Sequence, residues 1–277
     1  MPLSSFPLWF AAYLAVLAFV LGGIAGSALE CLAWRIVHHE SWAAGGRSHC
    51  PACGHTLGFF DLIPVFSWLA LRGRCRYCGK KIGVQHLLCE LLMSFVFLAL
   101  LVRYGVSVSL ARGLLLSCML LPAALCDLET FEIPDRFAVI GAAGWALLLP
   151  LAAGGWRHAF VQGLGGAALA AGVWAVAKAM EKRLGAAAMG GADIQLYALA
   201  GLYLGPALNL FNIALSCVVG LALSGAARRA GAQARAAQGN EDIPAAAFPF
   251  GPAIALSTVL CYLAGDAAVA WYWQLFA

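Results

Sequence analysis

The chain of 277 residues is 63% hydrophobic and only 11% charged, and its mean hydropathy is +0.85. Ordinary soluble domains carry roughly 25% charged residues, so this composition excludes a single soluble core and predicts a polytopic membrane protein. The net charge of +4 is small, and the positions of the basic residues are more informative than their sum.

The apolar residues fall into eight segments, each near the ~20 residues that a helix needs to span a bilayer. The first has no Lys or Arg before Arg35 and is too long for a cleaved signal peptide, so we expect it to be a retained span. A break at 205–213 predicts a tight turn between two spans, and 228–250 is expected to be a polar connector. The segments cover about 8–34, 87–102, 107–126, 137–153, 159–177, 194–210, 211–227 and 252–275.

A polar segment, 35–86, separates the first two spans and contains two Cys-x-x-Cys pairs. Cys50 and Cys53 form one pair, and Cys75 and Cys78 form the other after 21 intervening residues. Four thiolates at this spacing favour a closed structural zinc site over a redox or incidental pairing. Because so short a segment has little core, bound metal would supply much of its folding energy. The adjacent histidines, His49 and His55, are expected to lie on the surface.

The other six cysteines lie in or beside apolar segments, where we expect them to be small buried apolar side chains. They are Cys31, Cys89, Cys118, Cys126, Cys217 and Cys261.

The basic residues divide unequally between alternate loops. If successive loops alternate between the membrane faces, 14 of the 17 Lys and Arg residues share the face of the cysteine segment. The positive-inside rule then places this segment in the cytoplasm and both termini outside. It also places Asp127, at the end of the third span, and Asp193, at the start of the sixth, on the same cytoplasmic face.

Asp127 is the innermost acid of an acidic boundary, Leu125–Arg136, in which Pro134 marks the entry into the next helix. Two carboxylates that share a site do not ionise equally, so one acts as a general acid while the other activates water. Asp127 and Asp193 therefore predict a hydrolytic pair. Two alternatives remain open: a proton or ion relay, and a helix-capping role for Asp193.

Two more acids, Glu30 and Glu90, lie inside the first and second spans. Acids within a bilayer are costly, so each should face protein or water. For Glu90 an inter-helix contact and a functional role are both open, and Glu30 has no assigned role.

Several motifs together resemble the type IV prepilin peptidases, the leader peptidase/N-methyltransferases of type IV pilus and type II secretion systems. The resemblance covers nearly the whole chain, and the cysteine segment and the spacing from Asp127 to Pro134-Asp135 are its most specific parts. The matching stretches are Gly26-Ser27, Arg35, Arg47–Gly54, Asp61–Leu69, Arg72–Gly79, Glu90–Leu92, Asp127–Asp135 and Pro249–Pro252.

Three positions depart from the usual pattern of that family. The family usually reads Gly-x-Gly-Asp-x-Lys around the second aspartate, whereas this chain has Ala192 before Asp193 and Gln195 in place of the lysine. Glu30 stands where the family usually has Asn. The aspartate itself is retained, so an active enzyme is expected.

The resemblance implies an all-α transmembrane bundle of about eight spans, with a first span (1–34), a cytoplasmic zinc domain (35–86) and an aspartic peptidase domain (87–277). It implies cleavage of prepilin or pseudopilin leaders after a glycine at the cytoplasmic face of the bacterial inner membrane by Asp127 and Asp193. It also implies S-adenosylmethionine-dependent methylation of the new N-terminus, a zinc ion on the four cysteines, lipid contact and no nucleic-acid partner. The alternatives are a peptidase without the methyltransferase and a zinc-containing transporter or assembly factor.

Overall fold

The computed structural model describes residues 1–40, 48–152, 154–184, 190–238 and 249–274. Arg47 and residues 185–189 of the glycine-rich approach to Asp193 lie outside these ranges. The named elements of the described residues are all helices, and the fold divides into two compact units, Met1–Val106 and Ser107–Ala277. The three-part division expected from the sequence stays a prediction.

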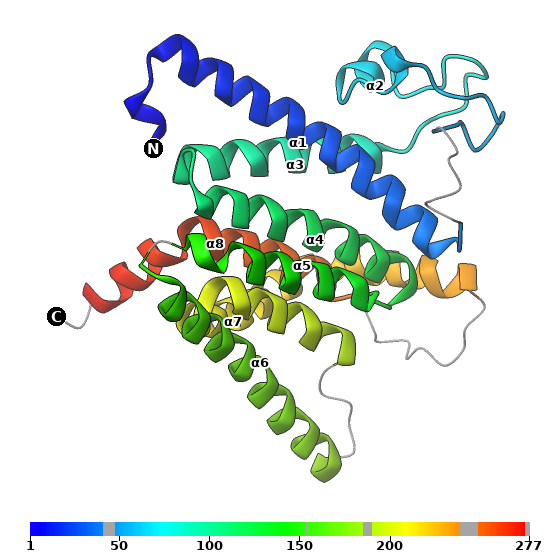
Figure 1. The fold of residues 1–277 in the computed structure, drawn as a ribbon. Helices are drawn as coiled ribbons and strands as arrows, with labels where there is room; N and C mark the ends of the chain where they lie inside the picture. Colours follow the sequence, from blue (N-terminus) through cyan, green and yellow to red (C-terminus); the bar gives the residue numbers. More distant parts are fainter. Residues whose placement is uncertain (41–47, 153, 185–189, 239–248, 275–277) are drawn as a thin grey trace. The chain divides into compact units, whose positions relative to one another are not determined.

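The first unit is built on two long antiparallel helices, α1 (Leu8–Val37) and α3 (Val84–Tyr104), after the short 3-10 helix η1 (Leu3–Ser5) (Figure 1). Two glycines allow them to pack closely, because a Cβ on Gly26 would lie only 2.6 Å from the Cys89 carbonyl oxygen. Gly22, one turn earlier, approaches the α3 backbone in the same way. This small-xxx-small spacing is typical of helix pairs in membranes.

Between these helices, the described residues of the cysteine segment form two short helical elements, the 3-10 helix η2 (Phe59–Asp61) and helix α2 (Phe66–Ala70). Two isolated antiparallel bridges, His49 with Thr56 and Arg74 with Lys81, close the loops that hold the cysteine pairs. The predicted polar segment is therefore a compact set of turns rather than further spans.

Within its described residues, the second unit contains five helices and one 3-10 turn. Pro122 interrupts the hydrogen-bond ladder of α4, and the left-handed residue Phe131 ends that helix, its amide bonded to the Asp127 carbonyl. The bounds are α4 (Val108–Thr130), α5 (Asp135–Leu148), η3 (Leu149–Leu151), α6 (Trp156–Leu184), α7 (Gly191–Gln238) and α8 (Gly251–Gln274).

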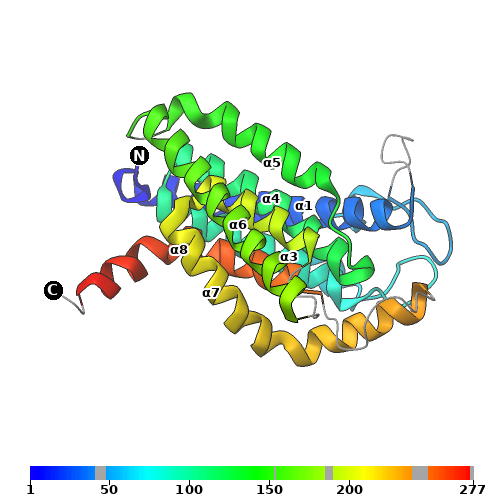
Figure 2. The ribbon, with the colours of Figure 1, turned by 90° about the horizontal axis from the view of Figure 1, so that it is seen from below.

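Helix α7 folds back on itself at Gly205, the one non-helical residue within it (φ 76°, ψ 176°). The reversal brings Tyr197 into hydrogen-bond contact with Ser216, although 19 residues separate them. The turn predicted at 205–213 is therefore present but shorter than expected, because Asn209 and Asn212 are helical. In Figure 2 the part after the turn is one long helix, coloured yellow to orange.

The first part of the segment predicted as a polar connector, 228–250, is helical. The second half of α7 continues as helix to Gln238, because Ala-rich sequence has high helix propensity whatever its polarity. Residues 239–248 lie outside the described part of the chain.

A buried polar network joins α7 to its neighbours. The Asn209 amide nitrogen donates to the carbonyls of Gly166 in α6 (3.0 Å) and Tyr197 (3.1 Å). Asn212 donates to Thr258 of α8 (3.1 Å) and accepts from Ser257 (2.6 Å). Hydrogen bonds of this kind hold helices together where lipid removes the hydrophobic driving force.

Five of the described helices have the length and composition of membrane spans: Leu8–Val37, Val84–Tyr104, Val108–Thr130, Trp156–Arg183 and Gly191–Leu223. The described part of α8 also contains a shorter apolar stretch, Gly251–Ala267. Helix α5, with 14 residues, is shorter than a usual span. These helices agree with a membrane protein, while the count of eight spans stays a prediction.

Candidate functional site

The first carboxylate of the predicted pair, Asp127, lies in the last turn of α4, and only 4% of its surface is exposed. The backbone amide of Gly251, the first residue of α8, donates a hydrogen bond of 2.6 Å to its Oδ2. A Cβ on Gly251 would lie 2.8 Å from that oxygen, so glycine lets the backbone reach the acid. Asp127 is therefore held from two helices.

The second carboxylate, Asp193, is the third residue of α7 and is half-buried. The amide of Gly190 donates a hydrogen bond back to it, so Asp193 also helps to cap the start of α7. Ala192 is helical and not among the non-glycine residues with positive φ, so the alanine causes no backbone strain here. Alanine in place of the family's glycine at 192 therefore adds a methyl group without changing the backbone geometry.

The two predicted carboxylates lie near enough for the charge of Asp127 to act on Asp193, although 66 positions separate them in the sequence. Asp127 has one backbone donor, and no cation bonded to it is found among the described residues. Two neighbouring acids without a cation share protons more easily than they both ionise. This arrangement permits general acid–base chemistry on a bound water.

Gln195 and Asp135 connect the starts of two helices beside the carboxylate pair. The Gln195 side-chain amide in α7 donates a 2.7 Å hydrogen bond to Asp135 Oδ1, at the first residue of α5. Gln195 therefore occupies the lysine position of the family pattern and still bonds an acid, but as a neutral donor.

The four cysteines of the two pairs form a second constellation, in the first unit. Their sulfur atoms all lie within 4.8 Å of one another, and the Cys50 and Cys78 sulfurs are 3.9 Å apart. All ten cysteines lie in the described part of the chain, and all are free thiols. The four-sulfur donor set fits zinc, which prefers tetrahedral thiolate ligands.

The two cysteine pairs have the same backbone geometry. The Gly54 amide donates to the Cys50 carbonyl (2.8 Å), and the Gly79 amide donates to the Cys75 carbonyl (3.0 Å). Both glycines have positive φ, which other residues adopt at a cost. Each pair is thus a tight turn that aims two sulfurs at one point.

Without a bound cation, the neighbouring thiols do not ionise equally. Hydrogen bonds from the Ala52 and Cys53 amides lower the pKa of Cys50 to about 6. The Lys80 amide acts to lower the pKa of Cys78, but desolvation and hydrogen bonds with neighbouring thiols outweigh it and raise the pKa to about 11. A bound divalent cation would allow all four to be thiolates.

Asp61 fastens the connecting loop to the second cysteine turn. It accepts hydrogen bonds from Arg76 (2.6 Å), Tyr77 (3.2 Å) and the Gly58 amide (3.0 Å). Burial acts to raise the pKa of Asp61, but these donors outweigh it and hold the pKa below its ordinary value. No sequence signal indicates this role, although Asp61 lies in a stretch that resembles the family.

The structure assigns partners to both intramembrane glutamates. Glu90 Oε2 accepts from the Val65 amide (2.7 Å), where Val65 has a left-handed φ of 64°. Glu30 pairs with His86 of α3 at 2.7 Å. Glu90 therefore anchors the cysteine segment, and Glu30 joins α1 to α3. No sequence signal identified His86 or Val65 as partners.

The remaining cysteine and histidine predictions are partly confirmed. His49 and His55 are exposed, as expected, and the His55 ring stacks on Tyr77. Of the six other cysteines, three are buried, two are intermediate and Cys217 is exposed on an apolar helix, where the expectation of burial was wrong. A helix face that meets lipid does not have to bury its apolar residues in protein.

These features define a helical membrane protein with two interacting carboxylates in its second unit and a tetracysteine cluster in its first. Residues 20–104 match the profile of the Bacterial Peptidase A24 N-terminal domain, and residues 114–225 match the Type IV leader peptidase family. The chain is 31% identical to a Prepilin leader peptidase/N-methyltransferase of Bacillus subtilis, over 92% of this chain and 96% of that protein. The chain belongs to the type IV leader peptidase family.

Two further relatives show the same likeness. A Prepilin leader peptidase/N-methyltransferase of Myxococcus xanthus is 42% identical over 57% of this chain, but the match spans only 47% of that relative. A Type 4 prepilin-like proteins leader peptide-processing enzyme of Escherichia coli is 34% identical, over 72% of this chain and 80% of its own length. No solved structure matches the chain at a significant level.

Proposed function

We propose that this protein is a membrane aspartic endopeptidase that removes the leader of type IV prepilins or pseudopilins. The names of the relatives support the substrate class. The observation that best supports this reaction is the carboxylate pair. The Gly251 amide donates a hydrogen bond to Asp127, and the charge of Asp127 acts on Asp193. One carboxylate activates water, and the other protonates the leaving amine.

The cleavage proposed is after a glycine, at the cytoplasmic face of the inner membrane. The basic-residue distribution of the loops supports this orientation. Exposed acids beside the pair, Glu132 and Asp135, would attract a basic leader, while the apolar remainder of the substrate lies against the spans.

Methylation of the new N-terminus with S-adenosylmethionine is part of the proposal, because the names of two relatives include N-methyltransferase activity. The four cysteines would hold zinc as a structural ion that stabilises the segment between α1 and α3. A peptidase without methylation is the alternative, and an unmethylated product would identify it.

The proposal is tested by cleavage of a prepilin-like peptide by purified protein in liposomes. We expect Asp127→Asn and Asp193→Asn each to lower the cleavage rate by about 10²–10⁴-fold, since each removes one half of the acid–base pair. Ala192→Gly should cleave at a rate equal to or above that of the unmodified chain. Equal cleavage by the unmodified chain and both Asn variants would contradict the mechanism.

A further inference from the structure

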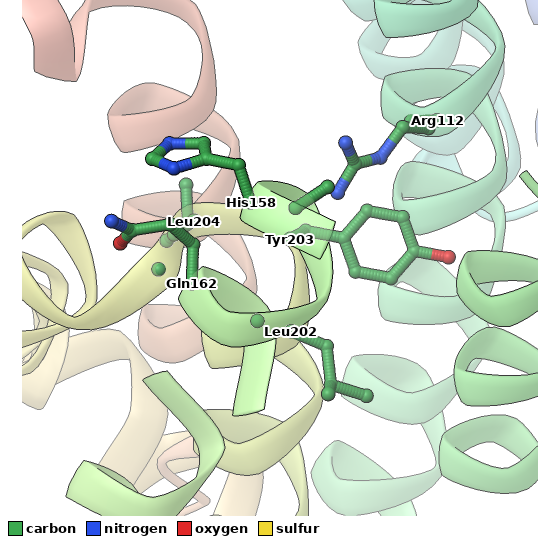
Figure 3. A pocket seen from close by; sticks show the side chains of 9 residues that line it. Arg112, His158, Gln162, Leu202, Tyr203 and Leu204 are labelled. Atoms are coloured by element: carbon green, nitrogen blue, oxygen red, sulfur yellow. The ribbon is translucent and has the colours of Figure 1, made fainter. Parts of the chain in front are cut away.

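The second unit contains a cavity at the opposite end of α4 from Asp127. Its volume is about 280 Å³, and α4, α6 and α7 each contribute to its wall. The polar lining residues are Arg112, His158, Gln162 and Tyr203, and the wall also includes Leu202 and the α7 turn at Gly205. Figure 3 shows the Arg112 guanidinium reaching from α4 toward the side chains of the other two helices.

Arg112 forms no ion pair with any acidic residue in the described part of the chain. Its Nε atom is buried and has no hydrogen-bond partner among the described residues. The guanidinium lies over the Tyr203 ring, 5.7 Å from its centroid, and the Tyr203 hydroxyl donates to the Gly141 carbonyl (2.7 Å). The ring is thus fixed as a platform that sets the position of Arg112.

None of the described residues that line the cavity is acidic. A guanidinium that has lost water on one side and has no anion opposite it is costly at the edge of a bilayer. Its planar donors match the oxygens of a phosphate, and Gln162 and His158 add further hydrogen-bonding groups on the facing helix. The lining side chains would therefore be complemented by a bound oxyanion.

We propose that this cavity binds a phosphate group, with Arg112 as its principal ligand. The group comes either from a phospholipid headgroup, with its chains running beside Leu202, or from a free phosphate. Arg112 lies 15 residues before Asp127 on the same helix, which is roughly 22 Å along the axis. The site is therefore separate from the carboxylate pair, and the inference does not depend on the proposed peptidase activity.

The test uses the full-length protein in detergent, with native mass spectrometry to count bound phosphatidylglycerol. Diacylglycerol, which lacks the phosphate, serves as the matched ligand control, and inorganic phosphate is tested by its effect on thermal unfolding at constant ionic strength. Arg112→Gln removes the principal ligand. Arg157→Gln is the matched control. Arg157 is an exposed cation at the start of α6, next to the cavity residue His158, but it lies over the Trp156 ring and does not line the cavity.

We expect phosphatidylglycerol to bind the unmodified chain about 10-fold or more tightly than Arg112→Gln, since a charge-assisted contact is lost. Arg157→Gln should bind within about twofold of the unmodified chain, because surface charge contributes little. Stabilisation by inorganic phosphate, lost in Arg112→Gln, without binding of the lipid would support the site with a free phosphate as its ligand.

Equal binding of phosphatidylglycerol and diacylglycerol, with no effect of inorganic phosphate, would overturn the proposal. An equal loss in the Arg112 and Arg157 variants would also overturn it. If Arg112→Gln does not fold, Gln162→Leu decides, because it keeps the side-chain size and removes a donor. Unchanged phosphate and lipid binding in that variant would count against the site.

Discussion

The backbone amide that bonds Asp127 comes from a residue 124 positions away in sequence. Gly251 reaches the carboxylate only because it has no side chain, since a Cβ there would lie 2.8 Å from Oδ2. At the scale of the residue, the site therefore depends on a glycine whose neighbours are Phe250 and Pro252. The family motif identifies the stretch Pro249–Pro252, but it does not indicate which acid accepts the hydrogen bond from Gly251.

We predict that Gly251→Ala lowers the rate of leader cleavage by about 10²-fold, because a shift of about 1 Å in a reacting group has that effect. Cleavage assays in liposomes measure this. The control is Gly172→Ala in α6, where a Cβ meets nothing within 4 Å. A similar loss in both variants would mean that the effect is general destabilisation rather than displacement of Asp127.

Gln195 carries a second residue-scale prediction. Gln195→Leu removes the donor to Asp135, and we expect cleavage to fall about 5-fold, because a hydrogen bond of this kind contributes about 1 kcal/mol. Gln195→Lys keeps a donor within reach of the acid and should cleave at least as fast as the unmodified chain. Equal rates in the Leu and Lys variants would show that the contact is not used.

At the scale of the element, the two cysteine turns are near copies in backbone geometry. Each has a glycine of positive φ directly after its second cysteine. In each, the backbone amide of the first cysteine donates a hydrogen bond to the carbonyl oxygen five residues later. Outside these turns the segment has little regular structure apart from η2 and α2. Its cross-links are the sulfur cluster, Asp61 and the Val65–Glu90 contact.

Metal removal should therefore unfold the cysteine segment while the helices remain. We expect about one zinc per chain in the purified protein and a loss of more than half of it in Cys75→Ser, since structural zinc contributes directly to folding. Metal analysis measures the content, and limited proteolysis between 48 and 82 measures the order of the segment. Cys217→Ser, which changes a thiol outside the cluster, should keep the metal. Retention in both variants would contradict a tetracysteine site.

At the scale of the whole molecule, the reversal of α7 at Gly205 changes the number of membrane crossings that the helices imply. A straight α7 counts as one span, whereas the Tyr197–Ser216 contact requires two antiparallel halves. With α5, α8 and both halves of α7 included, eight crossings return the chain to the side on which it began. Counting α7 as one span gives seven crossings and puts the termini on opposite sides.

We therefore predict that reporters fused to the two ends lie on the same, non-cytoplasmic face. Alkaline phosphatase, which needs an oxidising compartment, should be active at either end, and a cytoplasmic fluorescent reporter should work after residue 80. Fusions after residue 154 control for a loop on the outer face. Opposite results for the two termini would show that α7 crosses the bilayer once or that α5 does not cross.

The sequence alone was sufficient for the helical class of the fold, for the cysteine cluster and for the family. Apolar segment length indicates membrane spans, cysteine spacing indicates local turns, and the alternation of basic loops predicts that Asp127 and Asp193 share one membrane face. Each of these signals is local or depends only on counting crossings. For that reason the positions of α1, α3, α4 and the cysteine cluster were predicted closely, and the family was recognised from its motifs.

Only the tertiary structure decided which residues meet. Four contacts join elements that are far apart in the chain: the Gly251 amide at Asp127, the Glu30–His86 pair, the Val65–Glu90 hydrogen bond and Arg112 over the Tyr203 ring. A lone His or Gly has no periodicity or spacing that names its partner, because the partner is selected when helices pack. The turn at Gly205 likewise includes fewer residues than the composition of 205–213 suggested. Asn209 and Asn212 are helical instead, because their side chains form hydrogen bonds inside the bundle.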